Sequence, residues 1–137
     1  MLKARLRFPI SSLHRQLLQY LGLAITQISP NAWRVFLDVE VLYRAMFDGA
    51  RRLMVKEFFH CYRLDEIAQS KGMHSVVLRS SLLRLVYETV DSNRNWKSRY
   101  FFIEGDEWMC RLGDTKCIIV EKKWGILPPS GMNPYIF

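Results

Sequence analysis

The chain has 137 residues, of which 50% are hydrophobic and 24% are charged, so it is long and apolar enough to bury the core of one domain. This composition excludes a chain that is disordered throughout, and no apolar run reaches the roughly 18 residues needed to span a bilayer. The basic start, Met1 to Arg7, is followed by Pro9 and His14 rather than by the continuous apolar core of a signal peptide. We therefore expect an intracellular protein, cytoplasmic or nuclear, that does not insert into a membrane.

The net charge of +7 makes attraction to nucleic acid physically available, but a solvated basic surface explains the charge equally well. The cations are spread along the sequence, with no block of five or six. The three cysteines, Cys61, Cys110 and Cys117, lack the two close ligand pairs of a zinc site. Without a signal peptide, buried thiols are favoured over disulfides.

Two helices are predicted in the first third of the chain. Leucines recur at helical spacing over about Ser12 to Leu21, with His14 and Arg15 on the opposite, polar face and Gly22 as the stop. A second helix begins at Ser29-Pro30, where serine can cap and proline costs no hydrogen bond, and it ends at Asp48-Gly49. Its residues are apolar around nearly the whole circumference, which predicts a central, buried helix.

A third helix is predicted from about Ala50 to Tyr62, with a basic side formed by Arg51, Arg52 and Lys56. Because residues four apart lie on one helical face, Arg52 and Lys56 would point the same way. This is the best local candidate for a surface that faces phosphate. The alternative, a solvated helix face, carries more weight on sequence alone.

The second half of the chain is predicted to form a small, mostly antiparallel sheet. Asp65 to Gly72 indicates a polar loop or one helical turn, and Ser75 to Leu78 indicates a strand. Leu82 to Val90 fits both helical spacing and the alternation of a strand, with a slight preference for a strand. A β-meander would follow, with strands at Arg99 to Ile103, Trp108 to Leu112 and Cys117 to Val120. Residues 124–137 contain Pro128-Pro129 and are predicted to be an irregular tail.

The densest aromatic run of the chain extends from Asn95 to Trp108. Proteins that bind single-stranded nucleic acid combine rings, which stack on bases, with cations that hold phosphates, so Trp96, Lys97 and Arg99 are candidate binding residues. The glycines that the RNA-recognition motif places between its aromatic residues are missing. Packing within the sheet is the favoured alternative, because one face of any such strand must be core.

The sequence shows no catalytic or metal-binding constellation. His74-Ser75 lacks the glycines of a nucleophile elbow, and three acids near Gly105 are explained by a turn. No glycine-rich phosphate loop occurs. We therefore expect a protein that is not an enzyme and that needs no cofactor or metal.

Three segments together resemble a known family. They are Leu6-Arg7-Phe8-Pro9 with the leucine-rich helix that follows, Ile28-Ser29-Pro30-Asn31-Ala32-Trp33-Arg34, and Asn95 to Trp108. In this order they are similar to the plant gypsy-type retrotransposon domain, labelled a gypsy-type transposase, which is found at the start of plant gag-like polyproteins. Asn95 and Ile103 stand where that pattern has glycine and valine. The resemblance covers roughly Leu2 to Trp108 and implies a fragment that lacks the family's preceding segment.

The family label implies no chemistry that can be transferred, because a triad of carboxylates and a zinc knuckle are both missing from the sequence. We expect a single gag-like domain over residues 1–123, followed by the tail. Its predicted class is α+β, with three helices before a small antiparallel sheet. Its expected function is non-enzymatic assembly or interaction, including self-association. The alternative is a weak nucleic-acid-binding module without sequence preference, using the basic residues and Trp96 named above.

Overall fold

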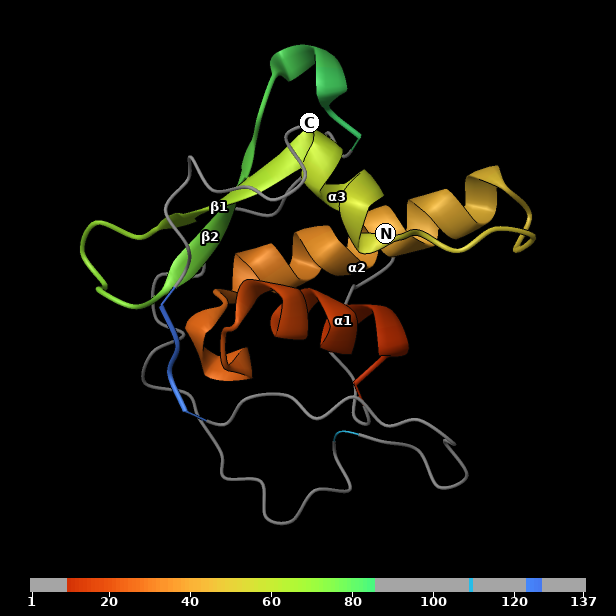
Figure 1. The fold of residues 1–137 in the computed structure, drawn as a ribbon. Helices are drawn as coiled ribbons and strands as arrows, with labels where there is room; N and C mark the ends of the chain where they lie inside the picture. Colours follow the sequence, from red (N-terminus) through yellow and green to blue (C-terminus); the bar gives the residue numbers. More distant parts are fainter. Residues whose placement is uncertain (1–9, 86–108, 110–122, 127–137) are drawn as a thin grey trace.

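The computed structural model describes residues 10–85, 109 and 123–126. In this part of the chain three helices precede a two-stranded antiparallel sheet, which confirms the predicted α+β class (Figure 1). The helices and strands are α1 (Ser12–Leu21), α2 (Pro30–Met46), α3 (Val55–Cys61), β1 (Tyr62–Glu66) and β2 (His74–Leu78), with short 3-10 turns at Ile25–Gln27 and Ser81–Leu83. The predicted β-meander and nearly all of the aromatic run lie outside the described residues. No helix among those described is long and apolar enough to cross a membrane.

The predicted bounds of α1 and the predicted start of α2 are confirmed, because local capping fixes them. The Ser11 side chain accepts a hydrogen bond from the His14 N–H at 3.3 Å, and Gly22 ends α1 with a φ of 64°. Ser29 accepts from the Ala32 N–H at 3.2 Å, with Pro30 as the first helical residue.

The core forms where the first half of α2 meets α3 and the start of β1. Phe36 lies 4.7 Å from Phe58 between ring centroids, and Phe58 stacks on Tyr62 at 5.0 Å. Trp33 packs edge-on against Phe36 and is only 6% exposed, as predicted. The burial does not continue along α2. Figure 1 shows the C-terminal end of α2 extending past α1 and α3, and Met46 there is 65% exposed, contrary to the prediction that its apolar residues are buried in a central helix.

The third helix is shorter than predicted, at both ends. Gly49 has a φ of 74° and reverses the chain, and α3 begins only at Val55, so Met54 is exposed rather than part of an apolar face. At its other end, Tyr62 belongs to β1 rather than to the helix. The Arg79 side chain donates to the carbonyl oxygens of Phe59 and Tyr62, which satisfies acceptors at this helix end.

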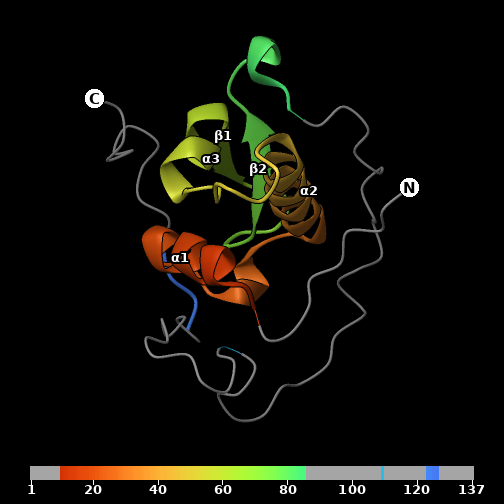
Figure 2. The same cartoon turned by 90° about the vertical axis from the view of Figure 1, so that its right-hand side faces the viewer.

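The strand β1 was not predicted, and β2 was. Residues 65 and 66, assigned to a polar loop, pair with β2 in a register that places Tyr62 opposite Leu78 and Glu66 opposite His74. The Ser29 N–H donates a hydrogen bond to the His74 carbonyl at 2.9 Å, which connects the start of α2 to β2. Figure 2 shows α2 nearly end-on beside this strand. Ser81–Leu83 is a 3-10 turn, so the strand preferred from Leu82 onward is wrong at its start.

We expect Trp33→Ala to lower the free energy of unfolding by about 3–5 kcal/mol, as deletion of a large buried aromatic side chain does. Trp33 also donates its indole N–H to the Ile25 carbonyl at 3.4 Å, so the substitution removes a hydrogen bond with the ring. Denaturant unfolding followed by circular dichroism measures the loss. Val41→Ala, on the exposed side of the same helix at 49% exposure, is the matched control. Equal stability losses for the two variants would contradict a core centred on Trp33.

Candidate functional site

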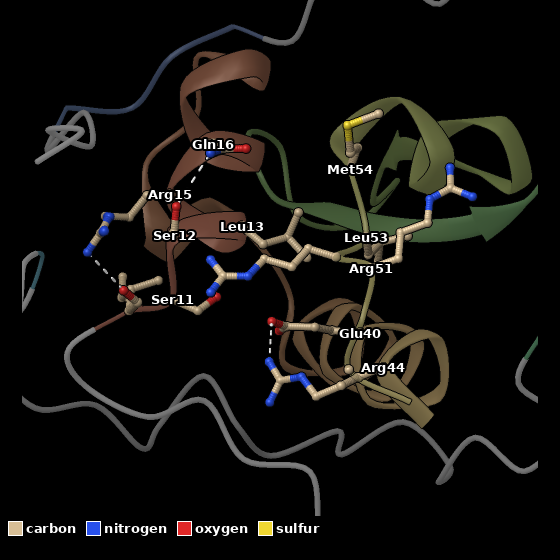
Figure 3. Close-up of a pocket in the computed structure, with 13 residues that line it drawn as sticks. Ser11, Ser12, Leu13, Arg15, Gln16, Glu40, Arg44, Arg51, Leu53 and Met54 are labelled. Atoms are coloured by element: carbon tan, nitrogen blue, oxygen red, sulfur yellow. Dashed lines mark hydrogen bonds and ion pairs between the residues drawn. The ribbon is translucent and has the colours of Figure 1, made fainter. Parts of the chain in front are cut away.

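A cleft of about 750 Å³ lies between the start of α1, the second half of α2 and the connection that leads into α3 (Figure 3). Ser11 and Ser12 border it from α1, and Leu53 and Met54 from the connection. The charged residues that line it are four arginines and one glutamate: Arg15, Arg44, Arg51, Arg52 and Glu40. This is a strongly basic concave surface in a chain whose net charge is +7.

The structure brings Arg51 and Arg52 to the cleft but not on a helix. Both precede α3, so Arg52 and Lys56 do not share a helical face, and that prediction is wrong. Lys56 lies in the first turn of α3 and is not among the residues that line the cleft. The other candidate binding residues, Trp96, Lys97 and Arg99, lie outside the described residues.

Arg51 is held in place by aromatic rings and a carboxylate. Its guanidinium lies 5.7 Å from the Tyr43 ring centroid and 5.4 Å from that of Phe47, and it forms an ion pair with Glu57. Burial opposes ionisation of Glu57, but hydrogen bonds from the Met54 N–H and the Tyr43 hydroxyl, together with the Arg51 charge, outweigh it and lower the pKa of Glu57. Arg51 is therefore preorganised, and part of its charge is compensated.

Arg44 and Arg52 supply the more available charge. Arg44 is exposed and forms an ion pair with Glu40 at 3.3 Å (Figure 3). Arg52 is exposed and makes no ion pair with any of the described residues, although its charge acts on Glu40. Burial raises the pKa of Glu40, against the opposing effect of these two arginines. One carboxylate thus faces two exposed cations, which leaves the cleft attractive to an anion.

Arg15 was predicted on the polar face of α1, and the structure buries it. Its guanidinium donates to the Ile10 carbonyl at 3.1 Å and to the Met109 carbonyl. Arg15 therefore joins the start of α1 to residue 109, which is itself buried. We interpret it as a structural cation at the border of the cleft rather than as a mobile ligand group.

The structure also brings together a serine, a histidine and a glutamate that the sequence analysis did not connect. Nδ1 of His14 lies 2.9 Å from the Ser11 Oγ, and Nε2 lies 3.4 Å from Oε2 of Glu40. Spacing of three along α1 accounts for the first contact, and only the fold supplies the second. This order of groups is that of a nucleophile, a base and an orienting acid.

Three observations favour a structural role for this trio. The Ser11 oxygen already caps α1, and the imidazole of His14 is buried between α1 and α2, edge-on to Trp33 at 5.6 Å. Burial also lowers the pKa of His14 to about 4, which makes it a weak base at neutral pH. His14 is therefore a neutral, buried link between the cap of α1 and Glu40.

Other reactive groups in the described part of the chain give no alternative site. Cys61 is half-buried, and burial raises the pKa of its thiol, which disfavours the nucleophilic thiolate. No group of three or more His, Cys, Asp or Glu residues within 10–85, 109 and 123–126 is arranged to hold a metal ion. Comparisons with protein-family models, with curated proteins and with solved structures found no match. The basic cleft and the sequence motifs are therefore the observations that bear on function.

We expect stability to fall as the pH is lowered from 6.5 to about 4. The pKa of His14 is near 6.5 in the unfolded chain and about 4 in the folded one, so the unfolded chain binds the extra proton across this window. The full effect corresponds to roughly 3 kcal/mol, at 1.36 kcal/mol per pKa unit. Unfolding measured from pH 7.5 to 4 in the parent and in His14→Gln tests it. Parallel pH profiles of the two proteins would contradict this assignment.

Proposed function

We propose that this chain is a non-enzymatic interaction domain that binds nucleic acid through the basic cleft without sequence preference. The observation that carries the proposal is the lining of the cleft, in which Arg44, Arg51 and Arg52 are exposed and Glu40 is the one acidic residue. Guanidinium groups donate in a planar fork that matches phosphate oxygens, and they stay charged at every physiological pH.

The cleft is suited to a charged polymer rather than to a small substrate. Arg44, Arg51 and Arg52 come from two different segments and remain exposed, so they offer separate contacts along a backbone. Their partners Glu40 and Glu57 neutralise part of the charge, which favours modest rather than tight binding. Contacts of this kind go to phosphates and therefore carry no base sequence information.

Self-association through the same end of the molecule is less favoured on physical grounds. Met46, Phe47 and Met54 are exposed there and would offer apolar contact area to a second copy. The same end carries Arg44, Arg51 and Arg52, and each copy has a net charge of +7, so two copies repel one another where a polyanion is attracted. The charge thus favours nucleic acid over assembly as the partner of this surface.

We place the domain in a gag-like protein of a plant gypsy-type retroelement, acting inside the cell. The support is the motif resemblance, in particular Pro30-Asn31-Ala32-Trp33-Arg34. In the structure this motif forms the capped start of α2 and supplies the buried Trp33. Its residues therefore have a folding role, and the binding role belongs to residues beyond it.

We expect the chain to bind a random-sequence single-stranded oligonucleotide with a Kd of about 10⁻⁴–10⁻⁶ M at physiological salt, and to release it as salt is added. Arg52→Glu should weaken binding to every sequence alike and lower the slope of log K against log salt by about one unit. Arg84→Glu is the matched control, because it changes the net charge equally at an exposed position that does not line the cleft. Fluorescence anisotropy over a salt series measures both.

Equal effects of Arg52→Glu and Arg84→Glu would show that binding depends on overall charge and not on the cleft. Undetectable binding at 20 mM salt would reject the nucleic-acid proposal. Light scattering of the same protein without oligonucleotide separates the two functions. A stable dimer that binds no oligonucleotide, and that Met46→Asp dissociates, would support assembly instead.

A further inference from the structure

A second built surface lies at the other end of α1, where residues 123–126 contact the turn that follows this helix. The side chain of Gln27 is fully buried and forms two hydrogen bonds with the backbone of Gly125. The Gly125 N–H donates to Oε1 at 2.8 Å, and Nε2 donates to the Gly125 carbonyl at 2.9 Å. The Gln27 side chain thus pairs with both the backbone N–H and the backbone carbonyl of Gly125, as a residue of a neighbouring strand would.

The remaining two hydrogen-bonding positions of Gln27 are also filled. Oε1 accepts from the Ala24 N–H at 2.9 Å, and Nε2 donates to the Gly72 carbonyl at 3.0 Å. The amide therefore satisfies its two donors and two acceptors by joining three chain segments. Removal of residue 125 would leave two of these four positions open at a buried site, which is unfavourable unless another group fills them.

The residue types at 124 and 125 are fixed by close contacts. A Cβ atom on residue 125 would overlap the Gly22 carbonyl oxygen, so glycine alone fits there. The Trp124 ring lies over Gly72, where an added Cβ would come within 2.7 Å of the ring, and its indole N–H donates to the Thr26 hydroxyl at 3.0 Å. The surface thus fits a tryptophan at position 124 through the shape of the ring and its hydrogen bond. At position 125 it admits only glycine, because any larger side chain would overlap the Gly22 carbonyl.

We propose that the surface formed by Gly22, Thr26, Gln27 and Gly72 is a recognition site for a Trp-Gly dipeptide in an extended segment. In this structure Trp124 and Gly125 of the same chain occupy it. The same dipeptide supplied by a second copy of the chain can take their place, because the contacts described above between residues 123–126 and this surface are all made by the dipeptide. A hollow of about 530 Å³ continues beyond Gly125 past His74 and Leu64 and offers room for the residue that follows.

The occupying segment stays largely exposed, which makes exchange feasible. Trp124 is 56% exposed in the bound arrangement, and Ile126 is almost fully exposed. Hydrogen bonds to Gln27 and Thr26 attach these residues to the surface. Such bonds exchange readily with water, and a segment attached mainly by them opens more easily than the helices of the core.

The test supplies the dipeptide in trans to the full-length chain. A fluorescein-labelled peptide with the sequence of residues 121–127, Glu-Lys-Lys-Trp-Gly-Ile-Leu, is titrated with the parent and with Gly125→Ala. Because alanine at 125 cannot occupy the site, we expect the peptide to bind the variant at least tenfold more tightly than the parent. Trp124→Ser, which removes the ring but leaves the Gly125 hydrogen bonds in place, is a second variant whose site is emptied on the tryptophan side, and it is used if Gly125→Ala does not fold.

Two controls assign the binding to the proposed surface. Thr26→Val in the Gly125→Ala background removes only the acceptor of the indole N–H, and it should weaken peptide binding severalfold. A peptide with alanine in place of its glycine should not bind, although its charge and its tryptophan are unchanged. Equal affinity of the two peptides, or equal affinity of the parent and both emptied variants, would overturn the proposal.

Discussion

The burial of one face of α2 against α3 is the interaction on which the rest of the described structure depends. Phe36 and Phe58 meet at 4.7 Å and are both almost completely buried, and Tyr62 extends this stack into the first strand. Large aromatic side chains bury 150–250 Å² each, so a few of them supply much of the core of a domain of this size. This contact fixes the direction of α3, and the direction of α3 determines where the connection carrying Arg51 and Arg52 runs. The position of the cleft therefore depends on the packing of aromatic residues that do not line it.

Three buried polar side chains each connect segments that apolar packing leaves separate. His14 contacts the cap of α1 on one side and Glu40 of α2 on the other, and Arg15 reaches the carbonyl of residue 109. Gln27 fastens residue 125 to the turn after α1. Buried polar groups are stable mainly where they form hydrogen bonds, so the bonds that these side chains make favour one arrangement of the chain. All three lie within or just after α1, which makes this helix the organiser of both proposed sites.

The sequence predicted the features that depend on neighbours along the chain. The Ser11 and Ser29 caps, the stop at Gly22 and the burial of Trp33 needed only local chemistry and helical periodicity, and they are confirmed. The bounds of α3 were wrong because residues 50–54 have helix-forming side chains, while the reversal at Gly49 and the contacts of Arg51 with Tyr43 and Phe47 hold them outside a helix. The strand β1 was missed because its outward residues are polar and its identity depends on pairing with β2.

The candidate sites were harder to predict than the fold, for the same physical reason. Arg51 and Arg52 could be chosen from sequence because they are adjacent cations, but Arg44 and Glu40 join them only when α2 and the connection come together in space. His14 and Arg15 appeared polar and solvated because periodicity assigns them to the face opposite the leucines. Their burial shows that part of the polar face of α1 is covered, by Glu40 at His14 and by residue 109 at Arg15, while Gln16 and Gln19 on the same face stay exposed.

The two ends of α1 differ in charge as well as in contacts. A helix of 10 residues is about 15 Å long, and its peptide dipoles place partial positive charge at Ser12 and partial negative charge at Leu21. The positive end borders the arginine cleft and adds to its attraction for anions. The negative end, where the Gly22 carbonyl abuts Gly125, offers an anion no such attraction. The helix dipole thus favours the proposed polyanion at the cleft and does not favour it at the opposite end, where the proposed dipeptide site lies.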